Sequence, residues 1–174
     1  MSNKASLSDQ LRTIAAFLGG SGVALGAYGA HGLIPKNTSN TTGTTMDHQS
    51  STAATVRENW KTAVMYQLIH AVSILTISTI VGSKEQQEQN RTLKSTTSGT
   101  HSSSAIMMHR SGQVMAVGTV LFSGSIYLLC LNIGPKYIWG PTTPIGGMLI
   151  IAGWVMMLSN TSDHNDGCDK EDKL

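Results

Sequence analysis

The chain has 174 residues, of which 13% are charged, and its net charge is only +2. A charge this small, without a basic cluster, argues against nucleic-acid binding, and two cysteines do not make a disulfide framework. Charged residues are absent from four windows, Thr13–Pro35, Thr62–Ser83, Ser111–Pro135 and Tyr137–Ser162. Each is at least as long as the roughly 20 residues that a helix needs to cross a bilayer. The sequence therefore predicts an all-α integral membrane protein, a four-helix bundle in a single domain.

The predicted spans follow these windows. In chain order they are Leu11–Leu33, Trp60–Val81, Val114–Ile133 and Thr143–Leu158. The first span lies where a signal peptide would lie, but Gly19, Gly20 and Gly22 interrupt its apolar run, so we expect a retained helix.

The segments outside the spans differ in kind. Three are polar and rich in Ser, Thr, Asn or acidic residues, and we expect them to be disordered because they cannot bury enough apolar surface. They are 36–55, 83–109 and 160–174. The connection before the fourth span carries three prolines, with Tyr137 and Trp139 suited to the membrane boundary. Thr143 before Pro144 resembles a helix cap, so this turn should be short and ordered.

Lysine and arginine predict the orientation. Of the 12 such residues, eight lie in the N-terminal segment, the second connection and the C-terminal tail, and four lie on the other side. Because cytoplasmic segments are enriched in these residues, we expect both termini on the cytoplasmic or matrix-equivalent side. The glycosylation sequons at Asn37 and Asn40 would then face the opposite side.

Small residues in the first span follow a regular spacing. They are Ala15, Gly19, Gly22, Gly26 and Gly29, in alternating steps of four and three. This spacing keeps them on one helix face. In lipid, helices associate through close contact across small residues, so this face should be a packing seam. Gly146 and Gly153 in the fourth span are one heptad apart, and we expect that span to be its partner.

Two histidines in the spans are candidate functional groups. His31 ends the first span near water, while His70 lies about 15 Å beyond Trp60, near the membrane midplane. Tyr66 lies one turn before His70 on the same face. Three roles remain open for His70: a structural hydrogen bond to another helix, a proton or solute path, or contact with a metal, haem or quinone. We expect it to be neutral.

Signals of an enzyme are absent from the spans. They contain no carboxylate, and no nucleotide-binding motif occurs, so we predict no catalytic residue, no metal ligand and no cofactor. Ser123 and Ser125 should bond carbonyls of their own helix. We expect the histidines of the polar segments to be solvated: His48, His101, His109 and His164.

Four stretches taken together are familiar. They are GAYGAHGL (26–33), WKTAVMYQLIHA (60–71), LFSGSIYLL (121–129) and GPTTPIGGMLIIAGW (140–154). In order and character they resemble the domain of unknown function 423 family, small multi-spanning proteins such as transmembrane protein 256. The resemblance covers all four spans and implies no established activity. Mapped by motif, its recurring polar positions add Tyr127 and Thr143 to the candidates above. The long polar connections depart from the family pattern.

Two functional hypotheses follow. The first is a non-enzymatic membrane component, such as a scaffold, an assembly factor or a subunit of a larger complex, with a membrane-protein partner or a second copy of itself. The second is a small transporter or channel with a polar path near His70. A continuous polar cavity around His70 would favour the second, and a close-packed core would favour the first.

Overall fold

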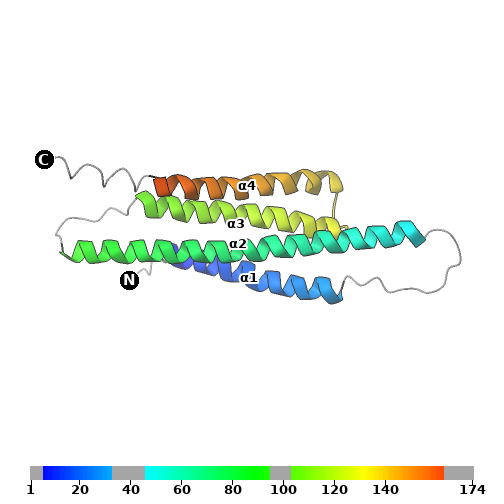
Figure 1. Ribbon diagram of the computed structural model, residues 1–174, viewed down its shortest axis with the longest axis horizontal. Coiled ribbons are helices and arrows are strands. Elements are labelled where there is room, and N and C mark those ends of the chain that lie inside the picture. Colours follow the sequence, from blue (N-terminus) through cyan, green and yellow to red (C-terminus); the bar gives the residue numbers. More distant parts are fainter. Residues whose placement is uncertain (1–5, 33–45, 95–102, 163–174) are drawn as a thin grey trace.

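The computed structural model describes residues 6–32, 46–94 and 103–162. In this part of the chain all regular structure is helical, in the order α1 (Leu7–His31), α2 (Met46–Lys94), α3 (Ser103–Cys130) and α4 (Lys136–Ser162) (Figure 1). Each helix contains a stretch that is long and apolar enough to cross a membrane. The predicted all-α fold with four long apolar helices is confirmed.

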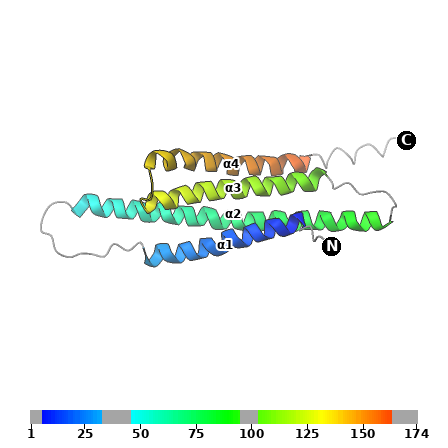
Figure 2. The ribbon, with the colours of Figure 1, turned by 180° about the vertical axis from the view of Figure 1, so that it is seen from behind.

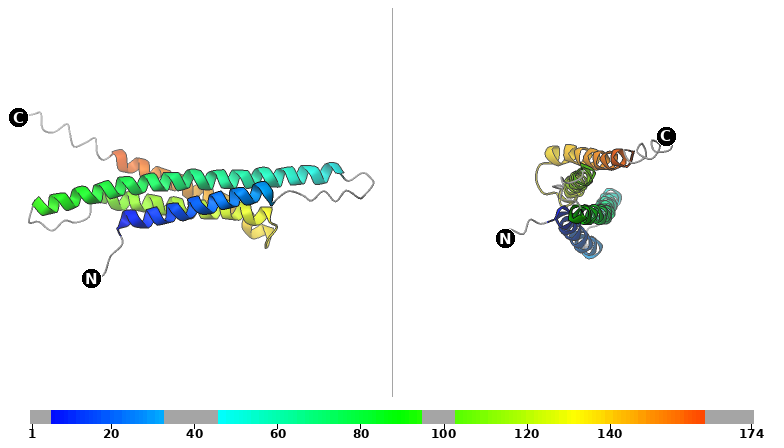
Figure 3. Two further views of the ribbon diagram at one scale, coloured as in Figure 1. Left: turned by 90° about the horizontal axis from the view of Figure 1, so that it is seen from below. Right: turned by 90° about the vertical axis from the view of Figure 1, so that its left-hand side faces the viewer.

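The helices pack in the order in which they follow in the chain. α1 contacts α2, α2 contacts α3 and α3 contacts α4, while α1 also touches α3. The start of α1 and the end of α4 lie at the same end of the bundle, as four alternating spans require (Figures 1 and 2). Within the described ranges, neither α1 nor α2 brings its backbone close to α4. Figure 3 shows α1 and α4 at opposite edges of the packed helices.

α2 is far longer than the predicted second span. Its 49 residues reach roughly 74 Å at about 1.5 Å per residue, more than twice the roughly 30 Å hydrocarbon core. It therefore projects past its neighbours at both ends (Figure 1). Residues 46–55 and 83–94, expected to be disordered, belong to this helix, whereas the rest of the first connection lies outside the described residues. An existing helix gains one hydrogen bond per added residue, so polar residues prolong it without burying apolar surface.

α3 and α4 also begin earlier than predicted. α3 starts at Ser103, so residues 103–109 are helical, and α4 starts at Lys136 rather than at Thr143. α4 runs on to Ser162, whereas the rest of the C-terminal tail lies outside the described residues. Two prolines therefore lie inside α4, at 141 and 144. Membrane helices accommodate proline where hydroxyl groups bond nearby carbonyls, and the two threonines between these prolines donate to carbonyl oxygens one turn back.

The turn between α3 and α4 is short and hydrogen-bonded. Asn132 adopts a left-handed conformation at φ 56°, and the Ile133 nitrogen donates to the Leu128 carbonyl at 3.0 Å. A left-handed residue at the end of a helix commonly lets a following N–H group bond one of the last helical carbonyls. Gly134 is also left-handed, and a Cβ there would lie 2.8 Å from the Trp139 indole nitrogen. The chain therefore reverses direction here.

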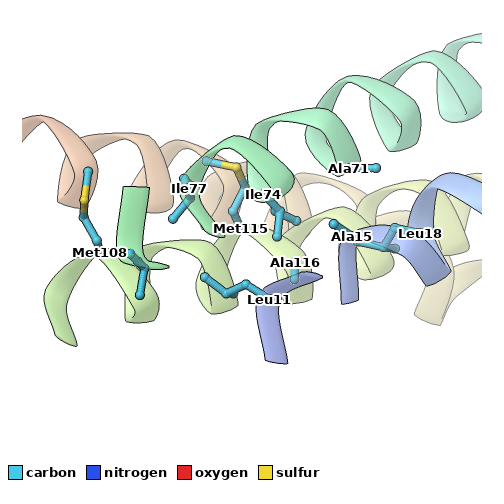
Figure 4. Packing of buried hydrophobic residues seen from close by; sticks show 10 residues of the cluster. Leu11, Ala15, Leu18, Ala71, Ile74, Ile77, Met108, Met115 and Ala116 are labelled. Carbon is cyan, nitrogen blue, oxygen red and sulfur yellow. The ribbon is translucent and has the colours of Figure 1, made fainter. Parts of the chain in front are cut away.

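The apolar core lies between α1, α2 and α3. Figure 4 shows its side chains converging from these three helices. The cluster consists of Leu11, Ala15 and Leu18 from α1, Ala71, Ile74, Ile77 and Val81 from α2, and Met108, Met115 and Ala116 from α3. By contrast, α4 packs on α3 and exposes an apolar face that includes Ile145, Met148, Ile151, Val155 and Leu158. Such a face suits contact with lipid or with another membrane protein.

Candidate functional site

Gln67 joins three helices in the middle of the bundle. Its side chain on α2 is only 4% exposed. The amide nitrogen donates to the Leu18 carbonyl of α1 at 2.9 Å and to the Ser21 hydroxyl at 2.8 Å. The amide oxygen accepts a hydrogen bond from the Tyr127 hydroxyl of α3 at 2.9 Å. An amide supplies both donors and an acceptor, so one side chain fixes α1 and α3 against α2.

Trp60 also joins α2 to α1, about two helical turns before Gln67. It is 2% exposed, and its indole nitrogen donates to the Leu25 carbonyl of α1 at 2.9 Å. Its ring lies against Gly29, where an added Cβ would collide with the indole. The Tyr127 ring centre lies 4.7 Å from that of Trp60, and the Tyr28 ring centre lies 5.6 Å away. Glycine at position 29 is therefore what lets the indole reach α1.

His70 is buried, as its position predicts, but its hydrogen bond differs from the expectation. The Nδ1 atom lies 2.7 Å from the Tyr66 carbonyl oxygen of its own helix, not from a group on another helix. The His70 and Tyr66 rings stack with centres 5.9 Å apart, and the Tyr66 ring lies 4.9 Å from that of Phe122 on α3. The local bond exists because the Tyr66 carbonyl is one helical turn away. His31 ends α1, and its side chain is exposed.

The two candidate serines of α3 link it to both neighbours. Ser123 donates to the Ala63 carbonyl of α2 at 2.9 Å, so the expected bond to its own helix is wrong. Ser125 does donate to the Phe122 carbonyl at 2.9 Å, and its hydroxyl also lies 2.7 Å from the Thr143 hydroxyl of α4. α3 lies between α2 and α4, so both neighbours come within reach of short side chains.

The small-residue face of α1 packs on α2. A Cβ at Gly26 would lie 3.3 Å from Val64, and one at Gly22 would lie 2.9 Å from Leu68. One at Gly19 would lie 3.8 Å from Ala71. Ala15 belongs to the core cluster. The expectation that the fourth span covers this face is wrong, because α4 lies at the opposite edge of the bundle.

The glycines of α4 contact α3 instead. A Cβ at Gly146 would lie 2.5 Å from the Phe122 backbone nitrogen, and one at Gly153 would lie 3.1 Å from Met115. Gly118 on α3 faces Gly146. The Ser111 hydroxyl donates to the Gly153 carbonyl at 2.7 Å. Close backbone approach thus holds α4 against α3, whereas we expected it to pack on the first span.

A polar cluster at the other end of the bundle lies where disorder was expected. Glu85 of α2 accepts hydrogen bonds from the Leu7 nitrogen at 3.1 Å, from the Ser8 hydroxyl at 2.9 Å and from Ser6. A carboxylate there satisfies N–H groups at the start of α1 and complements the positive end of its dipole.

His109 is buried rather than solvated, because α3 begins early and carries it into the bundle. Lys84 bonds Ser104 nearby.

Sequence reasoning missed Gln67, although a signal was present. Trp60, Gln67, Ile74 and Val81 recur every seven residues and are all buried. Ala63, His70 and Ile77 form a second buried row with the same spacing. Such rows mark the packed face of a helix. A polar residue in an otherwise apolar heptad row predicts a hydrogen bond between helices, which Gln67 makes and His70 does not.

Two grooves lie between the helices in the described part of the chain. One of about 440 Å³ lies between α1 and α2, and one of about 320 Å³ is lined by α2, α3 and α4. His70 lines neither of them. The described residues hold no group of three or more His, Cys, Asp or Glu that could bind a metal ion.

The amino-acid sequence of this chain matches a known protein family and several of its members. Residues 25–147 match the family model described as protein of unknown function (DUF423). The chain belongs to this family. Among DUF423 relatives, a UPF0382 membrane protein of Staphylococcus haemolyticus is 34% identical over 139 residues, covering 80% of this chain and 84% of the relative. The UPF0382 inner membrane protein YgdD of Escherichia coli is 33% identical over 137 residues, covering 78% of this chain and 76% of YgdD.

The family assignment agrees with the resemblance seen in the sequence. The matched region contains Trp60, Gln67, Ser123 and Tyr127, which join α1, α2 and α3, and it also contains His70. No solved structure matches the chain significantly. The chain is a multi-pass membrane protein, and the DUF423 description names no activity for its family.

Proposed function

We propose that this protein is a non-enzymatic membrane component, a scaffold, assembly factor or subunit that holds a partner at the edge of its bundle. The observation that carries the proposal is the use of its buried polar groups. Gln67, Tyr127 and Ser123 are each engaged in a hydrogen bond between helices. Groups engaged in this way stabilise one arrangement of the helices and are not available to a passing solute.

The exposed edge of the bundle supports the same proposal. α4 packs on α3 through Gly118, Gly146 and Gly153, where backbones approach closely. Its opposite face is apolar and unoccupied by other parts of the described chain. A helix held rigidly on one side and open on the other can dock a second membrane helix. By analogy with YgdD we propose an inner-membrane location. The distribution of Lys and Arg favours both termini on the cytoplasmic or matrix-equivalent side.

His70 supports an alternative function as a small transporter or channel. The residue is 5% exposed in the middle of α2, and an ionisable group at this depth is often part of a proton path. Against this alternative, its Nδ1 bonds the backbone, and neither groove reaches it.

Affinity purification of the full-length protein from native membranes in mild detergent tests the proposal. We expect one reproducible partner in a fixed ratio. It should be lost when Met148, Ile151 and Val155 on α4 are changed to alanine. The matched control changes Phe17 and Val23, exposed on α1, to alanine and should retain the partner. A protein that purifies alone, and that carries a proton or solute flux in vesicles abolished by His70→Leu, would support the alternative instead.

A further inference from the structure

The groove of about 440 Å³ between α1 and α2 has an apolar body and a charged end. Its apolar walls include Gly26 and Ala30 from α1 and Val64, Met65 and Ile69 from α2. Glycine at position 26 leaves room on the α1 side, because it has no side chain to fill the space. Two cations, Arg57 and Lys61, line the same groove. An occupant that matches it therefore combines an apolar chain with a negative charge.

The described residues neutralise only part of the positive charge at the groove. Lys61 pairs with Glu58 at 2.7 Å, and both side chains are well exposed. Arg57 is exposed and makes no ion pair with any described residue. Among the described groove residues and their partners, one full positive charge therefore remains. The guanidinium group binds phosphate with two parallel hydrogen bonds, which makes arginine well suited to a phosphate ligand.

The length of the groove matches one leaflet of a bilayer. From Arg57 to Ile69 α2 rises about 18 Å, and half of a hydrocarbon core is about 15 Å. Tyr28 is 49% exposed and its ring lies beside Trp60 near the charged end. Exposed aromatic side chains of this kind typically meet the headgroup region. A groove of this length is enough to extend from a membrane boundary to about the midplane.

We propose that this groove binds one anionic phospholipid, with its phosphate on Arg57 and one acyl chain between α1 and α2. A zwitterionic lipid would offset the positive charge less well. A soluble anion would leave the apolar body empty. The site is separate from the α4 edge proposed to dock a protein partner, so either proposal can fail without the other.

Native mass spectrometry of the full-length protein in mild detergent tests the headgroup. The protein is incubated with phosphatidylglycerol or with phosphatidylcholine, and the bound fraction is compared. We expect phosphatidylglycerol to be retained more, and Arg57→Gln to lower its retention about fivefold, the effect expected for one basic residue near an anionic lipid. Arg110→Gln, which removes an exposed cation outside the groove, is the control and should retain the lipid. Equal retention of both lipids by the unaltered protein would overturn the proposal.

A second pair of variants tests the groove itself. Ala30→Leu places a larger side chain in the groove, whereas Ala27→Leu adds the same side chain at an exposed position of α1 that does not line it. We expect only Ala30→Leu to reduce retention of phosphatidylglycerol. If both variants retain the lipid while Arg57→Gln loses it, the charge acts without the groove and the proposed site is wrong. Circular dichroism of each variant checks that the helices are intact.

Discussion

Gly118 of α3 and Gly146 of α4 face each other so closely that neither position has room for a side chain. A Cβ on Gly118 would lie 2.9 Å from the Gly146 carbonyl oxygen, and a Cβ on Gly146 would lie 2.9 Å from the Gly118 carbonyl oxygen. The atoms in the way belong to the backbone and cannot rotate aside. This contact helps to hold α4 against α3.

Gly146→Ala should therefore destabilise the protein, by about 1–3 kcal/mol as is typical of overpacking. Gly147→Ala is the matched control, because a Cβ there would meet only the Phe122 ring at 3.8 Å, an ordinary contact distance. We expect the control to be neutral or slightly stabilising, since alanine favours helix more than glycine does. Thermal unfolding in detergent measures both. Equal stability of the two variants would contradict the close approach.

The small-residue face of α1 leads to a second prediction. Replacing Gly22 and Gly26 with leucine should destabilise the protein, because both positions already lie close to Leu68 and Val64. The loss should again be about 1–3 kcal/mol per site. Gly20→Leu is the control, since no atom lies within 4 Å of a Cβ there. An unchanged unfolding temperature of the double variant would remove the argument for a packing face.

The hydrogen bond between Gln67 and Tyr127 can be measured by a double-mutant cycle. Tyr127→Phe and Gln67→Leu each remove one partner. Their coupling should be favourable, at least about 0.6 kcal/mol, the average for such bonds in membranes, and at most about 1.7 kcal/mol, the largest value found for them. Tyr28→Phe paired with Gln67→Leu is the control, because Tyr28 contacts Trp60 and not Gln67. Additive effects of the first pair would show that the bond contributes nothing.

His70→Leu should cost less than about 1 kcal/mol, because the bond it removes is local to α2. His70→Lys should impair insertion far more, since a charge near the midplane costs about 2.5–3.5 kcal/mol on insertion scales. Expression level, unfolding temperature and cellular phenotype of both variants provide the measurement. If the His70→Leu protein folds normally but no longer supports the cellular phenotype, a structural role for His70 is contradicted and a proton or solute path is favoured.

The orientation can be tested with the two cysteines. Cys168 lies outside the described residues, on the side predicted to be cytoplasmic, so a membrane-impermeant thiol reagent should label it from that side alone. Cys130 is half-buried, with its sulfur 3.5 Å from the Val56 carbonyl oxygen, and should react slowly. Single-cysteine variants in sealed vesicles separate the two signals. Labelling of Cys168 from the opposite face would reverse the orientation.

The sequence alone was enough to predict the four spans and the small-residue face of α1. Both depend on properties that single residues carry along one helix. A window without charges crosses the membrane because each charge would be costly there. Likewise, the spacing of Gly19, Gly22 and Gly26 places them on one face whatever lies opposite. The ends of α2 were predicted poorly, because a polar helix outside the membrane carries no apolar period.

Only the tertiary structure decided which surfaces meet. The partner of α1 is α2, because Trp60, Val64 and Leu68 fit against its glycines. Gly146 packs against Gly118, a residue that no spacing rule had singled out. Gln67 and Glu85 acquire their roles from carbonyl and N–H groups that lie more than 45 residues away in the chain. Hydrophobicity and period are properties of one segment, whereas packing and hydrogen bonding depend on the complementary shapes and positions of two.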